Sequence, residues 1–149
     1  MKLKNIINDL FTHNSPDVMS FRQGYDLTDL PVVTLYQNKK KFNFLLDTGS
    51  NCCIIDKNIL DSIEHNQLLE TSTVYGMEGN VQEVSACTIT LDYKNSRYTF
   101  GYLVQDMQKA FDNIKKSTGV TLHGILGSAF FAQFKYVLDF DELIAYSKL

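Results

Sequence analysis

The stretch Phe42-Asn43-Phe44-Leu45-Leu46-Asp47-Thr48-Gly49-Ser50 decides the fold. Its first five residues are mostly apolar and predict a buried β-strand. The strand ends at Asp47, and a tight turn is expected next, because Gly49 allows the backbone an approach that a Cβ would block. The hydroxyl of Thr48 can hold a neighbouring backbone group in place. The sequence therefore presents one carboxylate on a turn at the end of a strand.

The segments on either side of this stretch predict a mainly β chain with three or four short helices. Strands are expected over Val32–Tyr36, Phe42–Leu46, Thr71–Tyr75, Val81–Tyr93, Tyr98–Val104, Tyr136–Phe140 and Leu143–Tyr146. Helices are expected over residues 1–14, after Asp56 as N-cap, over Met107–Ile114 with Gly119 at the end, and from Ser128.

Length and composition narrow the class of protein. The chain has 149 residues, of which 44% are hydrophobic, enough for one domain with a real core. A net charge of −3 argues against a nucleic-acid partner. No apolar run approaches the ~20 residues of a membrane span, so no membrane association is expected. The three cysteines form no disulfide framework, and no signal peptide is apparent, which together predict a cytoplasmic protein.

Two further glycine elements follow the Asp-Thr-Gly turn. A glycine-bracketed turn spans Gly76–Gly79, and Gly124-Ile125-Leu126-Gly127 precedes a short helix. With Leu45–Ser50, these elements resemble, in chain order, the retropepsin-like aspartic proteases. The resemblance covers about Pro31 to Tyr146. It implies a protease domain over 31–149, with the single-lobe acid-protease barrel of pepsin's relatives. The predicted N-terminal helix and an extension, over residues 1–30, precede this domain.

The resemblance implies an aspartic endopeptidase that works as a homodimer without a cofactor or metal. Such an enzyme needs two carboxylates that share a proton around one water molecule. One activates the water, and the other donates a proton to the scissile carbonyl. The chain contains a single Asp-Thr-Gly, so each subunit is expected to supply Asp47 at a two-fold axis, with Thr48 against its partner. The substrate would be a peptide or protein in extended conformation.

Other site residues follow from the same resemblance. Tyr75, Gly76 and Gly79 stand where a flap over the substrate belongs, although Tyr75 could equally be a cross-strand packing residue. Ile125, between Gly124 and Leu126-Gly127, corresponds to a pocket-lining position, and a core position is the alternative.

Ser50 can donate a hydrogen bond to an ionised Asp47, which would favour the charged form and predict an acidic pH optimum. The chain departs from the viral pattern at Asn51 and Ser128, where an aspartate and an arginine commonly pair and help to fix the dimer. Dimer contacts are therefore expected elsewhere, in the N-terminal helix or the closing hairpin. The acidic groups at Asp26–Asp29 and Asp139–Glu142 lack a glycine turn and are interpreted as loop and hairpin charges.

Two alternatives stay open, and a third, a metal site, has little support. The chain could be a catalytically silent, dimeric peptide-binding module of the same fold. A cysteine nucleophile is possible in principle, because Cys52, Cys53 and Cys87 coexist with three histidines, but no local motif supports one. A metal site has too few suitably spaced ligands. His123 is interpreted as a polar residue at a strand end.

Overall fold

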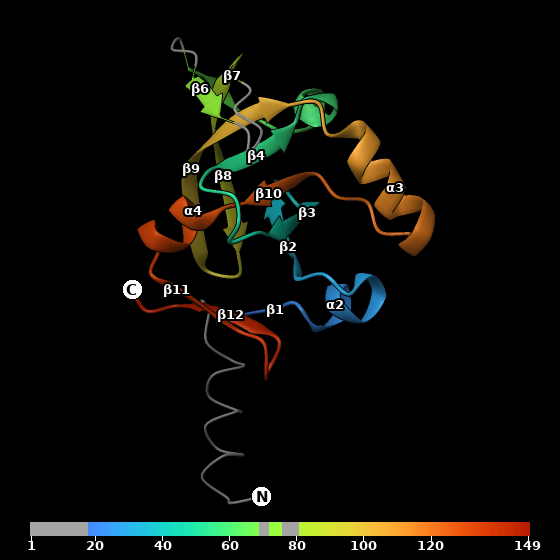
Figure 1. The fold of residues 1–149 in the computed structure, drawn as a ribbon. Helices are drawn as coiled ribbons and strands as arrows, with labels where there is room; N and C mark the ends of the chain where they lie inside the picture. The colour runs from blue at the N-terminus through green and yellow to red at the C-terminus, as the bar shows by residue number, and fades with distance from the viewer. Residues whose placement is uncertain (1–17, 69–71, 76–80) are drawn as a thin grey trace, which may run out of the picture.

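The chain is mainly β and is built around a six-stranded closed barrel (Figure 1). The computed structural model describes residues 18–68, 72–75 and 81–149. The predicted helix over residues 1–14 and the glycine turn Gly76–Gly79 lie outside the described residues.

Twelve strands and four helical segments make up the described part of the chain. The strands are β1 Val18–Ser20, β2 Val32–Gln37, β3 Lys40–Leu46, β4 Cys53–Asp56, β5 Asn66–Gln67, β6 Ser72–Tyr75, β7 Val81–Val84, β8 Ala86–Tyr93, β9 Ser96–Gln105, β10 Gly124–Leu126, β11 Tyr136–Asp139 and β12 Ile144–Ser147. The helices are α2 Arg22–Thr28, the 3₁₀ helix η1 Lys57–Ser62, α3 Gln108–Thr118 and α4 Ser128–Gln133.

The barrel follows the order β2-β3-β10-β4-β9-β8, and β8 pairs back with β2 at Tyr36 and Asp92 to close it. Most neighbours are antiparallel, but β3 and β10 run parallel, as do β4 and β9. The short β10 is thus inserted between β3 and β4, the two strands that the Asp47 turn connects. This insertion brings Gly124–Gly127 beside Asp47, which lies about 80 residues away along the chain.

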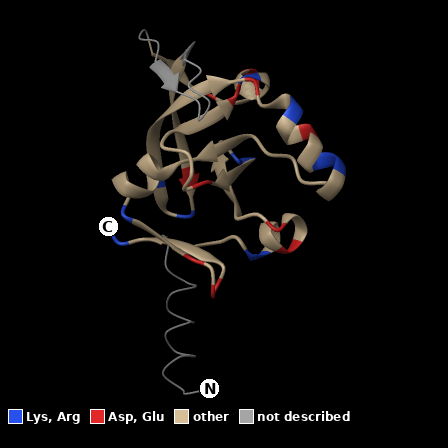
Figure 2. Ribbon diagram, in the orientation of Figure 1, with Lys and Arg blue, Asp and Glu red and all other residues tan. Residues whose placement is uncertain are grey.

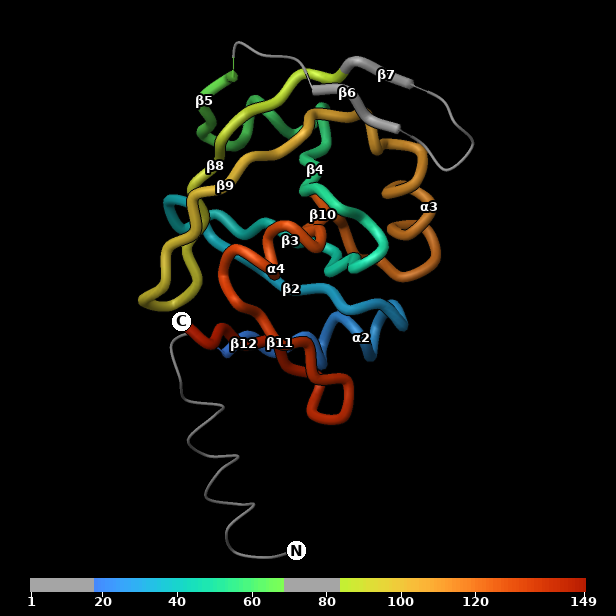
Figure 3. The backbone as a smooth tube through the Cα atoms, turned by 60° about the vertical axis from the view of Figure 1, so that its left-hand side comes forward, coloured from blue at the N-terminus to red at the C-terminus, as the bar shows by residue number. Residues whose placement is uncertain are grey.

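The two ends of the described chain meet in a second small sheet, in the order β1-β12-β11. The predicted closing hairpin is confirmed as β11 and β12, and β1 adds to it from the same chain. Together with α2 this sheet lies at one end of the barrel, whereas α3 lies along its side (Figures 1 and 3). Residues 18–30, expected as an extension, therefore contribute a strand and a helix to the fold.

Alternating side chains fill the barrel. Phe42, Phe44 and Leu46 of β3 point inward, and Ile89 and Leu91 of β8 do the same, as a period of two requires. A second hydrophobic cluster lies outside the barrel, under α3. It contains Val32, Phe111, Leu122 and Ile125.

Three local expectations need correction. Asp26–Asp29 belong to α2 and its C-cap rather than to a loop, because Tyr25 and Phe21 anchor this short helix against the body. The predicted strand Val81–Tyr93 breaks at Ser85 into β7 and β8. The helix after Asp56 is a 3₁₀ helix, although Asp56 is its N-cap as expected, accepting a hydrogen bond from Asn58 N at 3.3 Å.

No helix among the described residues is long and apolar enough to cross a membrane.

Asp56 is expected to be a major source of stability. Its carboxylate is 5% exposed and accepts hydrogen bonds from Asn58 Nδ2 at 2.9 Å and from the Met107 amide at 3.1 Å, joining η1 to the start of α3. Asp56→Ala removes the acceptor of these bonds and leaves the Met107 amide unpaired, so we expect a loss of about 2–4 kcal/mol in the free energy of unfolding, measured with urea. Asp106→Ala, which removes an exposed partner of the same Asn58, should cost clearly less. Equal losses in the two variants would contradict this role.

Candidate functional site

The loop that carries Asp47 is held at its start by the barrel. Asp47 follows β3 directly, and its amide donates to the Leu126 carbonyl of β10 at 2.9 Å. The loop then turns back on itself, with Gly49 N donating to Asp47 Oδ1 at 2.9 Å and Ser50 N to the Asp47 carbonyl at 3.2 Å. A Cβ on Gly49 would lie 3.1 Å from Asp47 Oδ1, so a small residue suits this turn. Asp47 is partly exposed, and Thr48 and Gly49 are exposed, so the tip of the loop faces solvent.

The second half of the loop is held by α4. The amide of Ser128 donates to the Ser50 carbonyl at 2.7 Å, and that of Ala129 donates to the Asn51 carbonyl at 3.2 Å. The first amides of a helix have no partners within the helix, so the loop satisfies them. Gly127 makes this approach possible, because a Cβ there would lie 2.2 Å from the Cys52 carbonyl oxygen. The backbone of Ser50-Asn51 is therefore bonded to that of Ser128-Ala129, and positions 51 and 128 lack the charged side chains of the viral pattern.

Aromatic rings anchor α4 to the barrel. Phe130 is 1% exposed and contacts Phe100 of β9, Phe134 and Tyr136, with ring centroids 4.8–5.8 Å apart. Tyr98 of β9 joins the same group. The interpretation of Phe130–Phe134 as a buried helical turn is confirmed. Since α4 cannot shift without disrupting these contacts, the loop that it holds is fixed as well.

The predicted hydrogen bond from Ser50 to Asp47 is wrong. The Ser50 hydroxyl donates instead to the Cys52 carbonyl at 2.7 Å, because the loop bends to bring that carbonyl within reach. The group that donates to the Asp47 carboxylate is the backbone amide of Gly49. The acidic pH optimum expected from a Ser50–Asp47 bond loses its support.

The other predicted site residues belong either to β10 or to the predicted flap. Gly124 and Leu126 lie in β10 and pair with β3; a Cβ on Gly124 would lie 2.5 Å from the Ile54 carbonyl oxygen. Ile125 is 8% exposed and packs under α3, which favours the core position over the pocket-lining one. Tyr75 ends β6, which pairs with β7 in a separate two-stranded sheet. The flap tip with Gly76 and Gly79 lies outside the described residues.

The thiols of Cys53 and Cys87 are poorly suited to nucleophilic attack. Cys53 lies on β4 with 1% exposure, and burial raises the pKa of its thiol to about 12. Burial also raises the pKa of Cys87. A thiolate is the reactive form, so neither group supplies one near neutral pH. Cys53 Sγ instead accepts the Gly127 amide at 3.5 Å, a structural contact that the sequence pattern alone did not indicate.

His123 helps to fix the strand that leads to Asp47. It lies just before β10, and its Nδ1 accepts the Asn43 amide of β3 at 2.9 Å, so the ring is neutral in this arrangement. Its own amide donates to the Asn43 carbonyl at 2.9 Å. Burial lowers the pKa of His123, and the charge of Asp56 opposes this shift in part. The interpretation of His123 as a polar residue at a strand end is confirmed.

We expect the stability of the fold to fall as the pH drops below about 6.5. Because the pKa of His123 is lower in the folded chain than in the unfolded chain, its contribution is complete above the ordinary value of 6.5. It is lost as the pH falls through the folded value, since the unfolded chain then binds the extra proton. His123→Asn, which can keep an acceptor near the Asn43 amide, should flatten the change in urea midpoint between pH 7 and pH 5. His65→Gln, at an exposed position, is the control and should leave that change intact.

Charges and possible metal ligands are dispersed over the molecule. Figure 2 shows acidic and basic residues interspersed, with both signs on α3. Within residues 18–68, 72–75 and 81–149, no group of three or more His, Cys, Asp or Glu side chains is placed to hold a metal ion.

Comparisons of the sequence with protein-family models and with curated proteins give no match.

Proposed function

We propose that this chain is an aspartic endopeptidase that acts as a homodimer, with two Asp47 carboxylates, one from each subunit, around the attacking water. The observation that carries the proposal is the loop of Asp47. It is clamped by β10 on one side and by α4 on the other, and its tip is exposed. A rigid loop that presents a single carboxylate at the surface suits a site completed by a second copy.

The chemistry requires two carboxylates that share one proton, because two negative charges at close range cannot both form cheaply. The ionised Asp47 takes a proton from water as the water oxygen attacks the peptide carbonyl carbon. The protonated Asp47 of the second copy donates its proton to the carbonyl oxygen, giving a neutral tetrahedral intermediate. Collapse of this intermediate breaks the carbon–nitrogen bond. The leaving nitrogen takes the proton that the first Asp47 received from water, and the second Asp47 regains a proton from a hydroxyl of the intermediate.

The neighbouring groups suit this role. Thr48 is exposed beside Asp47, where it can brace the same residue of a second copy. The hairpin of β6 and β7 is the segment proposed to cover an extended peptide, which would bind by strand addition.

The closing hairpin already pairs with β1 of its own chain, so β12 has no free edge for a partner within the described sheet.

Sedimentation over a range of protein concentrations, with cleavage of a peptide library measured on the same samples, tests the proposal. We expect cleavage to follow the dimer fraction and to be inhibited by a statine peptide but not by iodoacetamide. Cleavage by a stable monomer would contradict the mechanism. A dimer that binds peptides without cleaving them would instead identify the silent peptide-binding module.

A further inference from the structure

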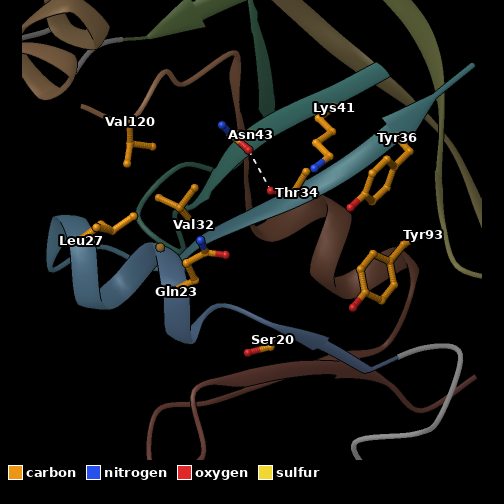
Figure 4. Close-up of a pocket in the computed structure, with 11 residues that line it drawn as sticks. Ser20, Gln23, Leu27, Val32, Thr34, Tyr36, Lys41, Asn43, Tyr93 and Val120 are labelled. Atoms are coloured by element: carbon orange, nitrogen blue, oxygen red, sulfur yellow. Dashed lines mark hydrogen bonds between the residues drawn. The ribbon is translucent and has the colours of Figure 1, made fainter. Parts of the chain in front are cut away.

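A polar pocket of about 390 Å³ lies between α2 and the outer face of the β2–β3 hairpin, and no residue of the Asp47 loop lines it (Figure 4). Its size is within the range of small-molecule sites. Leu27, Gln23 and Gly24 of α2 form one wall, and Ser20 and Tyr93 complete the rim. None of these residues has a part in the proposed peptidase site.

The register of the hairpin gives the pocket a gradient of polarity. Val32, Thr34 and Tyr36 occupy every second position of β2 and so share one face of the strand. On β3, Asn43 lies opposite Thr34 and Lys41 lies opposite Tyr36. Figure 4 shows Leu27, Val32 and Val120 gathered at one end and Tyr36, Lys41 and Tyr93 at the other. The five residues from Val32 to Tyr36 span roughly 13 Å of strand. A ligand with an apolar body and one polar end fits this gradient.

The polar end is suited to a single negative charge. Lys41 is the one charged residue among the described residues that line the pocket, so no carboxylate of the lining neutralises its charge. Tyr93 hydrogen-bonds with the backbone of Ser20, and burial raises the pKa of its phenol, so it stays protonated near neutral pH. One cation with neutral hydroxyl donors matches a carboxylate better than a phosphate, which carries more charge and usually recruits several cations or amides.

The middle of the pocket is already ordered. The Thr34 hydroxyl donates to Asn43 Oδ1 at 2.8 Å, and Asn43 Nδ2 donates to the Thr121 carbonyl at 2.8 Å. These bonds fix the Asn43 amide before any ligand arrives, so binding does not have to order this part of the wall.

We propose that this pocket binds a small carboxylic acid, with the carboxylate at Lys41 and the apolar body against Leu27, Val32 and Val120. The proposal is independent of the peptidase activity, and its test does not use that activity.

Titration of the full chain with 4-phenylbutyrate, followed by backbone amide NMR shifts, tests the proposal. The neutral 4-phenylbutyramide serves as the matched ligand. We expect saturable binding of the acid with a dissociation constant below about 1 mM and shifts centred on residues 20–27, 32–36 and 41–43. The amide should bind at least about tenfold more weakly, because it lacks the charge that Lys41 attracts.

Two variants probe the two ends of the pocket. Lys41→Met should weaken binding of the acid at least about tenfold, whereas Lys109→Met, at an exposed position of α3 outside the pocket, should not change it. Leu27→Glu brings a negative charge to the apolar end at a side chain that is 55% exposed, so the fold should tolerate it while binding falls by a similar factor. The proposal is overturned by equal binding of acid and amide, by full binding in both pocket variants, by shifts elsewhere, or by no saturation up to about 10 mM.

Discussion

Asp47→Asn is expected to reduce peptide hydrolysis at least about 10⁴-fold while leaving the fold and the dimer intact. Both copies of the residue change at once, so the dimer loses its base and its acid together. The replacement keeps the shape of the side chain, and its amide oxygen can still accept the Gly49 amide that now lies 2.9 Å from Oδ1. Initial rates on a peptide identified in the library screen, with sedimentation of the same samples, measure the two effects separately.

Asp61→Asn is the matched control, because it makes the same chemical change at an exposed position of η1 and should retain full activity. Mixing wild-type chains with Asp47→Asn chains tests whether two subunits share one site. If subunits exchange freely between equal amounts of wild-type and Asp47→Asn chains, about a quarter of the dimers hold two Asp47 carboxylates, so activity per wild-type chain falls to about half. Persistent cleavage by the pure variant would refute the aspartic mechanism, and an undiminished mixture would refute the sharing of one site by two subunits.

Gly127→Ala is expected to lower the free energy of unfolding by at least about 2 kcal/mol and to impair catalysis beyond that loss. The added Cβ would lie 2.2 Å from the Cys52 carbonyl oxygen and 2.7 Å from that of Ser50. Both neighbours are backbone atoms, so the clash cannot be relieved by rotating a side chain. The loop and α4 must move apart, which weakens the bonds from Ser128 and Ala129 that hold the loop.

Gly101→Ala is the matched control, since a Cβ at this position of β9 has no atom within 4 Å. Its free energy of unfolding should stay within about 0.5 kcal/mol of the wild type or rise slightly, because alanine has less conformational entropy to lose than glycine. Urea unfolding of all three proteins at one protein concentration measures the difference. Equal midpoints for Gly127→Ala and Gly101→Ala would show that α4 does not clamp the loop.

Local patterns in the sequence predicted most of the β elements and α3. Gly119 ends α3 in the left-handed conformation expected of it, with φ of 78°. The helix α2 escaped prediction, because Arg22–Thr28 has no apolar stripe and leaves Leu27 exposed. Its stability comes from contacts with distant residues, which a local pattern does not contain.

The site was predictable only in part, for a similar reason. The Asp-Thr-Gly turn and Gly127 could be identified from their residue types. The partner of the Ser50 hydroxyl could not, since Asp47 and the Cys52 carbonyl both lie within three residues of it and the bend of the loop selects between them. The role of His123 toward Asn43 could not be predicted either, because it depends on the pairing of β10 with β3.

The sequence alone determined that a buried strand ends in a single carboxylate on a glycine turn, because alternation and glycine act over a few neighbouring residues. Tertiary structure decided what surrounds that carboxylate. The insertion of β10 between β3 and β4 brings Leu126, Gly127 and the start of α4 onto the loop. The physical reason is that hydrogen bonds between segments about 80 residues apart form only once the barrel has closed.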